Sequence, residues 1–145
     1  MVFSEAILHN CLYFTANSLS RIITRMAEDE FRHTGISPSY AYVLIVAYDH
    51  PGISQKEICN LLNLAPSTVT RFVDTLVQKK YLIRKSDGKI SRIYTTGKGK
   101  DLQRVIRDCW HNLYSRYAGI IGREEGDNLA HMMDRISNQL QESES

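Results

Sequence analysis

The chain has 145 residues, of which 43% are hydrophobic and 23% are charged, and its formal net charge is +2. This length suffices for one domain with a buried core, and the composition excludes a chain that is disordered throughout. No apolar run approaches the roughly 20 residues that cross a bilayer. The N-terminal stretch also lacks the basic segment and cleavage site of a secretory signal. We therefore expect a cytoplasmic protein with no membrane partner.

The cysteines and the motif content argue against several chemistries. The three cysteines, Cys11, Cys59 and Cys109, are scattered and form no CxxC pair, which disfavours a disulfide framework or a structural zinc site. The sequence contains no phosphate-binding P-loop, no GxGxxG, no GxSxG and no HExxH motif. We expect no enzyme activity, no cofactor and no bound metal.

The N-terminal half is predicted to be helical. Apolar residues at three- and four-residue spacing predict a helix over residues 4–32, capped by Ser4. Gly35 is expected to end it, and Ser37 with Pro38 to start the next. The helix over residues 39–49 is apolar nearly all round, so we expect it to be buried.

A turn at residues 50–52 leads into two short helices. Ser54 and Glu57 form a capping-box pattern ahead of the first. Asn63 tolerates a positive φ and is expected to end it. The second begins at Pro66, and its buried face should be Val69, Phe72, Val73, Leu76 and Val77.

The remainder of the chain is predicted as a hairpin and two more helices. Asp87 and Gly88 suit a two-residue hairpin turn. Thr95 or Thr96 is expected to cap a long helix that ends at Gly122, and a last helix should follow from about Asp127. The fold class is mainly α with a small β-hairpin, in the order α-α-α-α-β-β-α-α.

Two short helices with a tight connection describe a helix-turn-helix, whose second helix reads the DNA major groove. Its outward positions begin with Ser67, Thr68, Thr70 and Arg71. Short hydroxyl side chains let the helix approach closely, and an arginine can bond a guanine edge. The alternative interpretation is that Ser67 and Thr68 only cap the helix.

The hairpin that follows is strongly basic. Residues 71–100 hold nine Lys and Arg against Asp74 and Asp87, a net charge of +7, which leaves −5 for the rest of the chain. A helix-turn-helix followed by a basic hairpin is a winged helix, whose cations neutralise phosphate. Contacts to the DNA backbone are predicted for Gln55, Lys56, Arg84, Lys85, Lys89 and Arg92.

The run "HPGISQKEICNLLNLAPSTVTRFVDTLVQKKYLIRK", followed by "YTTGKGKDL", resembles the multiple-antibiotic-resistance regulator (MarR) family of transcription factors. The likeness covers nearly the whole chain and implies a homodimeric winged helix, usually a repressor, on a palindromic double-stranded operator. It implies one MarR-like domain over residues 1–145, with the DNA-binding part at 36–96 and helical dimerisation parts at 4–33 and 97–142. It also makes Ser67, Thr68, Thr70 and Arg71 the base-reading candidates. The wing departs from the family because "SDGK" is about four residues shorter than usual.

Three chemistries for a regulatory signal stay open. Cys11 occupies a place similar to the oxidised cysteine of peroxide-sensing relatives. A small aromatic or phenolic effector is the second option, in a cleft lined by Arg21, Tyr40, Tyr42, Trp110 and Tyr114. Metal sensing is the third, because Glu28, Glu30, His33, Cys109 and His111 are ligand types, although their spacing resembles no defined site.

The competing function class is a winged helix that binds another protein and not DNA. The core of a protein interface is apolar or aromatic, whereas the outward face at residues 67–78 is small, polar and cationic. The sequence therefore favours DNA.

Overall fold

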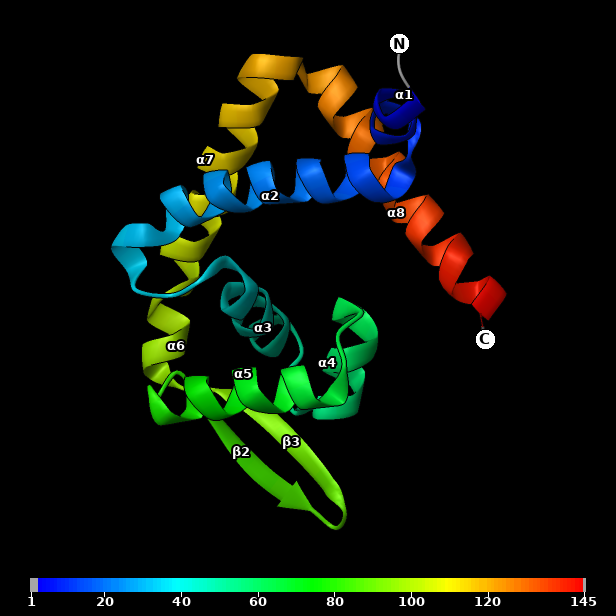
Figure 1. The fold of residues 1–145 in the computed structure, drawn as a ribbon. Helices are drawn as coiled ribbons and strands as arrows, with labels where there is room; N and C mark the ends of the chain where they lie inside the picture. Colours follow the sequence, from blue (N-terminus) through cyan, green and yellow to red (C-terminus); the bar gives the residue numbers. More distant parts are fainter. Residues whose placement is uncertain (1–2, 145) are drawn as a thin grey trace. The chain divides into compact units, whose positions relative to one another are not determined.

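The computed structural model describes residues 3–144, and Figure 1 shows the course of the chain. The chain forms two compact units, one ending at Cys109 and the other starting at Trp110. The first unit holds α1 (Phe3–Asn10), α2 (Leu12–Phe31), a 3-10 turn η1 (Arg32–Thr34), α3 (Pro38–Asp49), β1 (Ile53–Ser54), α4 (Gln55–Leu62), α5 (Pro66–Gln78), β2 (Leu82–Asp87), β3 (Ile90–Thr95), α6 (Gly97–Asp101) and the start of α7 (Gln103–Ile121). The second holds the rest of α7 and α8 (Arg123–Glu144). The predicted class, mainly α with a small hairpin, is confirmed.

The predicted helix over residues 4–32 is two helices. Cys11 is extended, with φ −96° and ψ 123°, and separates α1 from α2. Its carbonyl accepts hydrogen bonds from the Thr15 backbone N (3.0 Å) and the Thr15 hydroxyl (2.9 Å), which starts α2 anew. Ser4 lies inside α1 and is not its cap. Hydrophobic periodicity gives no sign of this break, because Ile7, Leu8, Cys11 and Leu12 keep three- and four-residue spacing across it.

The helix-turn-helix forms as predicted. Ser54 caps α4 by accepting the Glu57 backbone N–H at 3.1 Å, and Asn63 ends the helix with φ 53°. Ala65 is the N-cap of α5 and Pro66 its first residue. Ser37 is the N-cap of α3, but its side chain makes no capping hydrogen bond.

The sheet has one strand more than predicted. The order is β1-β3-β2, all antiparallel, with Ile53 opposite Ile93. The hairpin turn is shifted by one residue: Asp87 pairs with Ile90, so the turn residues are Gly88 and Lys89. Of these only Gly88 has a positive φ, 63°, so a glycine is needed at one turn position and not at both.

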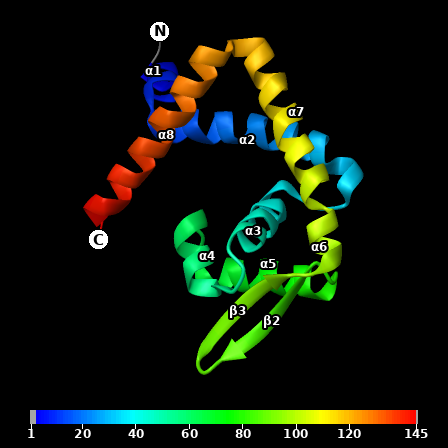
Figure 2. The same cartoon turned by 180° about the vertical axis from the view of Figure 1, so that it is seen from behind.

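The core of the first unit lies between α3, α5 and β3. The side chains with no solvent exposure there include Val43, Leu44, Val69, Val73, Leu76 and Ile93. The helix expected to be buried all round, α3, exposes Tyr42 on one side (48%). Figures 1 and 2 show the hairpin projecting from this unit on the side away from α2.

A T-x-x-G pattern, from Thr96 to Gly99, joins the hairpin to α6. Thr96 caps α6 by accepting the Gly99 N–H at 3.1 Å, and its hydroxyl is within 2.7 Å of the Lys80 carbonyl oxygen. A Cβ at position 99 would overlap the carbonyl oxygen of Tyr81. Gly99 is therefore required where the backbone at the start of β2 meets α6.

Two helix boundaries near the C-terminus differ from expectation. The predicted long helix is interrupted at Leu102, between α6 and α7. The last helix begins at Arg123, immediately after Gly122, and not near Asp127. In the described part of the chain, no helix has the length and apolarity needed to span a bilayer.

We predict that Gly99→Ala destabilises the protein by about 1–3 kcal/mol, because the new methyl group overlaps the Tyr81 backbone. Gly97→Ala is the matched control, since a Cβ at position 97 has no atom within 4 Å. Urea unfolding measures both variants. Equal stability of the two would contradict this account of the glycine.

Candidate nucleic-acid interface

The outward face of α5 is formed by the residues predicted to read bases. Ser67, Thr70 and Arg71 are exposed and Thr68 is half-buried, while Val69 and Val73 are buried beneath them. The N-cap is Ala65, and no side chain caps the helix. Capping therefore does not account for Ser67 and Thr68, and their side chains are available at the surface.

Arg71 lies beside an aromatic stack. Its guanidinium carbon is 5.4 Å from the centre of the Phe72 ring, within the range of a cation–π contact. Phe72 in turn packs on Tyr40, with ring centres 4.5 Å apart. The guanidinium of Arg71 thus lies beside the aromatic contact between α3 and α5.

A chain of hydrogen bonds crosses the surface from α5 to the hairpin. Gln55, the first residue of α4, donates through Nε2 to Thr70 Oγ1 at 3.2 Å. Arg84 of β2 donates through Nε to Gln55 Oε1 at 2.8 Å and through Nη2 to Asp74 Oδ1 at 2.6 Å. Three elements are therefore joined at one place by polar contacts.

Arg92 is held within the wing. Its Nε donates to Asp87 Oδ2 at 2.9 Å and its Nη1 to the Gly52 carbonyl at 3.0 Å. The hydrogen bond to Asp87 raises the pKa of Arg92 above its usual value. The cation therefore keeps its charge but is directed toward the protein.

The lysines in and near the hairpin differ in the contacts that they make. Lys56 and Lys89 are exposed, and Lys85 lies 5.2 Å from the centre of the Tyr94 ring. Lys98 is exposed as well, but its Nζ donates to the Lys79 carbonyl at 3.0 Å. Part of the +7 charge of residues 71–100 is thus engaged in contacts with the protein itself.

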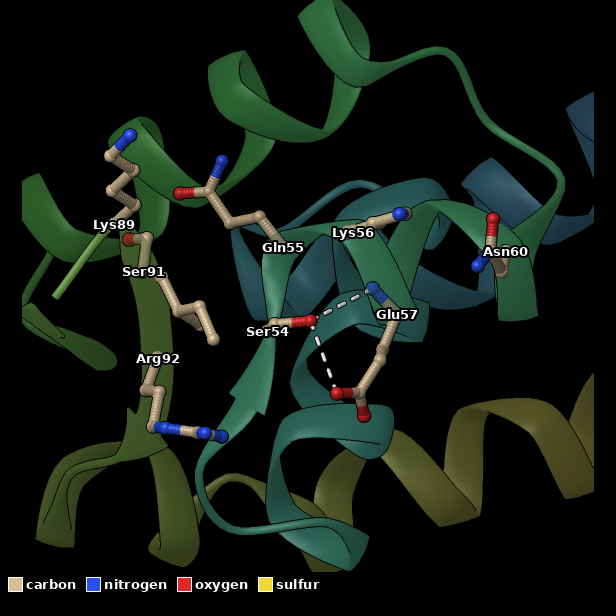
Figure 3. Close-up of a pocket in the computed structure, with 9 residues that line it drawn as sticks. Ser54, Gln55, Lys56, Glu57, Asn60, Lys89, Ser91 and Arg92 are labelled. Carbon is tan, nitrogen blue, oxygen red and sulfur yellow. Dashed lines mark hydrogen bonds between the residues drawn. The ribbon is translucent and has the colours of Figure 1, made fainter. Parts of the chain in front are cut away.

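A groove of about 610 Å³ separates the start of α4 from β3. Figure 3 shows its polar walls, with the Gln55 amide extending away from the Ser54–Glu57 cap. Lys56 and Lys89 line the groove together with Arg92. The charged residues of its lining are these three cations and Glu57, so the groove carries a net positive charge and suits an extended anionic chain.

The five residues predicted for an effector cleft are divided between the two units. Arg21, Tyr40 and Tyr42 belong to the first unit, and Trp110 and Tyr114 to the second. Within the second unit, the Tyr114 hydroxyl donates to Asp127 Oδ1 at 3.0 Å, and this bond raises the pKa of Tyr114.

The cysteines differ in access. Cys11 and Cys59 are half-buried and Cys109 is buried, and desolvation raises the pKa of the Cys109 thiol. A thiol with a raised pKa forms less of the reactive thiolate. Burial therefore disfavours Cys109 as a reactive thiol. Among residues 3–144 no group of three or more His, Cys, Asp and Glu is placed to hold a metal ion.

Sequence reasoning missed the contacts that arrange this surface. Gln55 was predicted to contact only DNA backbone, and Asp74 was given no role, yet both bind Arg84. Gln55 lies 15 residues from Thr70 and 29 from Arg84. No local pattern reports contacts over such separations.

Comparison with known proteins agrees with this architecture. Residues 34–93 match the model of the MarR family. The regulator SarZ of Staphylococcus epidermidis, described as an HTH-type transcriptional regulator, is 26% identical over 132 residues, covering 89% of this chain and 88% of SarZ.

Solved structures share the fold over almost the whole chain. The transcriptional repressor CouR bound to a 23-mer DNA duplex superposes with a TM-score of 0.84 at 18% identity, covering 94% of this chain and 99% of CouR. CouR from Rhodococcus jostii RHA1 bound to p-coumaroyl-CoA gives a TM-score of 0.77 at 18% identity, over 89% and 93% of the two chains. The helix-turn-helix and most of the basic wing lie within residues 34–93, so this part of the chain matches the MarR family of transcriptional regulators.

Proposed function

We propose that this protein is a sequence-specific, double-stranded DNA-binding regulator that acts as a homodimeric repressor in the cytoplasm and catalyses no reaction. The observation that carries the proposal is the outer face of α5, where Ser67, Thr70 and Arg71 are exposed beside a basic hairpin. Short hydroxyls and an arginine are the side chains that pair with base edges. An apolar centre, which a protein-binding surface would need, is lacking at these positions.

The proposed duplex contacts divide into two kinds. Thr68 joins the three exposed residues of α5 in base reading, while Gln55, Lys56, Arg84, Lys85, Lys89 and Arg92 hold the backbone. The cationic groove between α4 and β3 supports this second role. The family's relatives support it as well, since MepR of S. aureus and CouR have both been solved with DNA.

The homodimer is supported by apolar side chains that the single chain leaves exposed. Tyr13 of α2 is 80% exposed and Ile120 of α7 is 76% exposed. Ile7, Leu8 and Leu12 are exposed beside Tyr13 in sequence, and large apolar side chains exposed along one stretch of chain favour a partner that covers them. A two-fold dimer also presents two recognition helices about 34 Å apart, one turn of DNA, as a palindromic site requires.

The first test is a gel-shift screen of genomic fragments, starting with DNA upstream of the protein's own gene. We expect a preferred pseudo-palindromic fragment whose affinity falls steeply with salt, because phosphate contacts release counterions. Binding without any sequence preference at moderate ionic strength would refute the repressor proposal.

A matched pair of variants separates base reading from backbone binding on that fragment. Arg71→Ala should lose about 1–3 kcal/mol of discrimination between specific and random DNA. Lys89→Ala should weaken both alike and lower the salt slope by about 1. If Arg71→Ala weakens specific and random DNA equally, Arg71 contacts phosphate.

The ion pair between Asp87 and Arg92 leads to a prediction of tighter binding. Asp87→Asn removes a negative charge from the wing and weakens the 2.9 Å contact with Arg92 Nε, because a neutral amide oxygen replaces the carboxylate. We expect higher affinity for all sequences and a salt slope steeper by about 1. Glu28→Gln serves as the control, because Glu28 is exposed on α2 and the substitution changes the net charge by the same amount. Unchanged or weaker binding by Asp87→Asn alone would show that the pair is needed to shape the wing.

We further propose that an effector releases the DNA, either a small aromatic ligand or oxidation of Cys11. CouR bound to p-coumaroyl-CoA supports an aromatic ligand. If oxidation is the signal, peroxide should release DNA from the wild type and from Cys59→Ser, but not from Cys11→Ser, in the gel-shift assay. The same response in Cys11→Ser would exclude oxidation of Cys11 as the signal.

A further inference from the structure

The direction of the hydrogen bonds around Gln55 determines how Thr70 meets DNA. Arginine nitrogens only donate, and the guanidinium stays charged. The Gln55 atom that faces Arg84 Nε at 2.8 Å must therefore be its carbonyl oxygen. This assigns the orientation of the amide, which otherwise could be flipped.

With Oε1 directed at Arg84, the Gln55 amide nitrogen faces Thr70. It donates to Thr70 Oγ1 at 3.2 Å, so the threonine oxygen is the acceptor in this contact. A hydroxyl carries one hydrogen to donate and two lone pairs that accept, and Gln55 occupies one of these lone pairs. Within residues 3–144 that hydrogen has no acceptor, whereas Thr75, on the same helix, donates to the Arg71 carbonyl at 3.0 Å.

Asp74 holds the start of this chain in place. Its Oδ1 accepts from Arg84 Nη2 at 2.6 Å, while Arg84 Nε is bound to Gln55. Two bonds from one planar guanidinium fix its direction more firmly than one would. Arg84 thus donates both to Asp74 and to Gln55, and Gln55 donates in turn to Thr70, so the series ends on a hydroxyl group whose proton is unused within residues 3–144.

We propose that Gln55 is a specificity-determining positioning residue, which occupies a lone pair of Thr70 Oγ1, favours Thr70 as a hydrogen-bond donor toward the major groove and thereby disfavours cytosine. The inference rests on the proposed function, in which the outer face of α5 reads bases. A threonine normally serves as donor or acceptor. Guanine, adenine and thymine each present an acceptor in the major groove, while cytosine presents only its N4 amino donor.

The decisive variant is Gln55→Glu, which replaces the amide nitrogen with an oxygen at constant shape. The carboxylate accepts from Arg84 and from the Thr70 hydroxyl, so the threonine oxygen then turns its lone pairs outward. Glutamate also suits the first position of α4, where negative charge favours a helix start. The variant is thus expected to fold while inverting the hydrogen-bond direction.

The experiment measures binding of the full-length protein to its selected operator and to all single-base substitutions of it. Thr70→Val identifies the position that Thr70 reads, because the preference there disappears. At that position the wild type and Thr70→Ser should prefer guanine or thymine over cytosine by about 2- to 10-fold. Gln55→Glu should prefer cytosine over guanine and thymine.

Gln78→Glu is the charge control, since Gln78 is exposed on α5, the helix that carries Thr70. It should weaken all sequences alike and keep the wild-type preference. The proposal is overturned if Gln55→Glu still excludes cytosine, or if Thr70→Val alters no base preference. In both cases sequence-specific binding by the wild type stands, so the proposed function survives. A wild type with no base preference at any position overturns both.

Discussion

Val69, Val73 and Leu76 are completely removed from solvent on the inner side of α5. Burying a side chain of this kind contributes about 1.5–3 kcal/mol, more than any polar contact on the outer face. The burial of these three side chains therefore determines how α5 is rotated about its axis. With 3.6 residues per turn, Ser67, Thr70 and Arg71 must point outward. The proposed recognition surface depends on this apolar face, and its chemistry can vary without altering the orientation of the helix.

The distribution of charge around α5 serves shape as much as attraction. Asp74 and Asp87, the two acidic residues among nine cations, each bind an arginine of the hairpin. Arg84 connects the sheet to α4 and α5 through hydrogen bonds, and Arg92 joins the hairpin to the turn before β1. Exposed lysines supply most of the unpaired charge. The wing is thus positioned by its arginines, and its lysines are left for the polyanion.

Features with a local cause were readable from the sequence. Ser54 and Asn63 bracket α4 because a cap and a left-handed residue act within one turn of backbone. The break at Cys11 was not readable, since the apolar spacing continues through it. The link from Gln55 to Thr70 depends on how α4 packs against α5, and that packing comes from the whole core. The residues of the candidate surface were identifiable, but not the bonds that orient them.

Gly88 and Lys89 form a two-residue turn, the short connection that is commonest in β-hairpins. Ordering a flexible residue on binding costs about 1–2 kcal/mol, so a long wing tip that becomes fixed only on DNA would lose part of its contact energy to this entropy. Here the tip is already closed by the Asp87–Ile90 pair in the free protein. Compared with a long tip, this wing therefore offers fewer contacts to a duplex. Each contact is made by a surface that is already ordered before DNA binds.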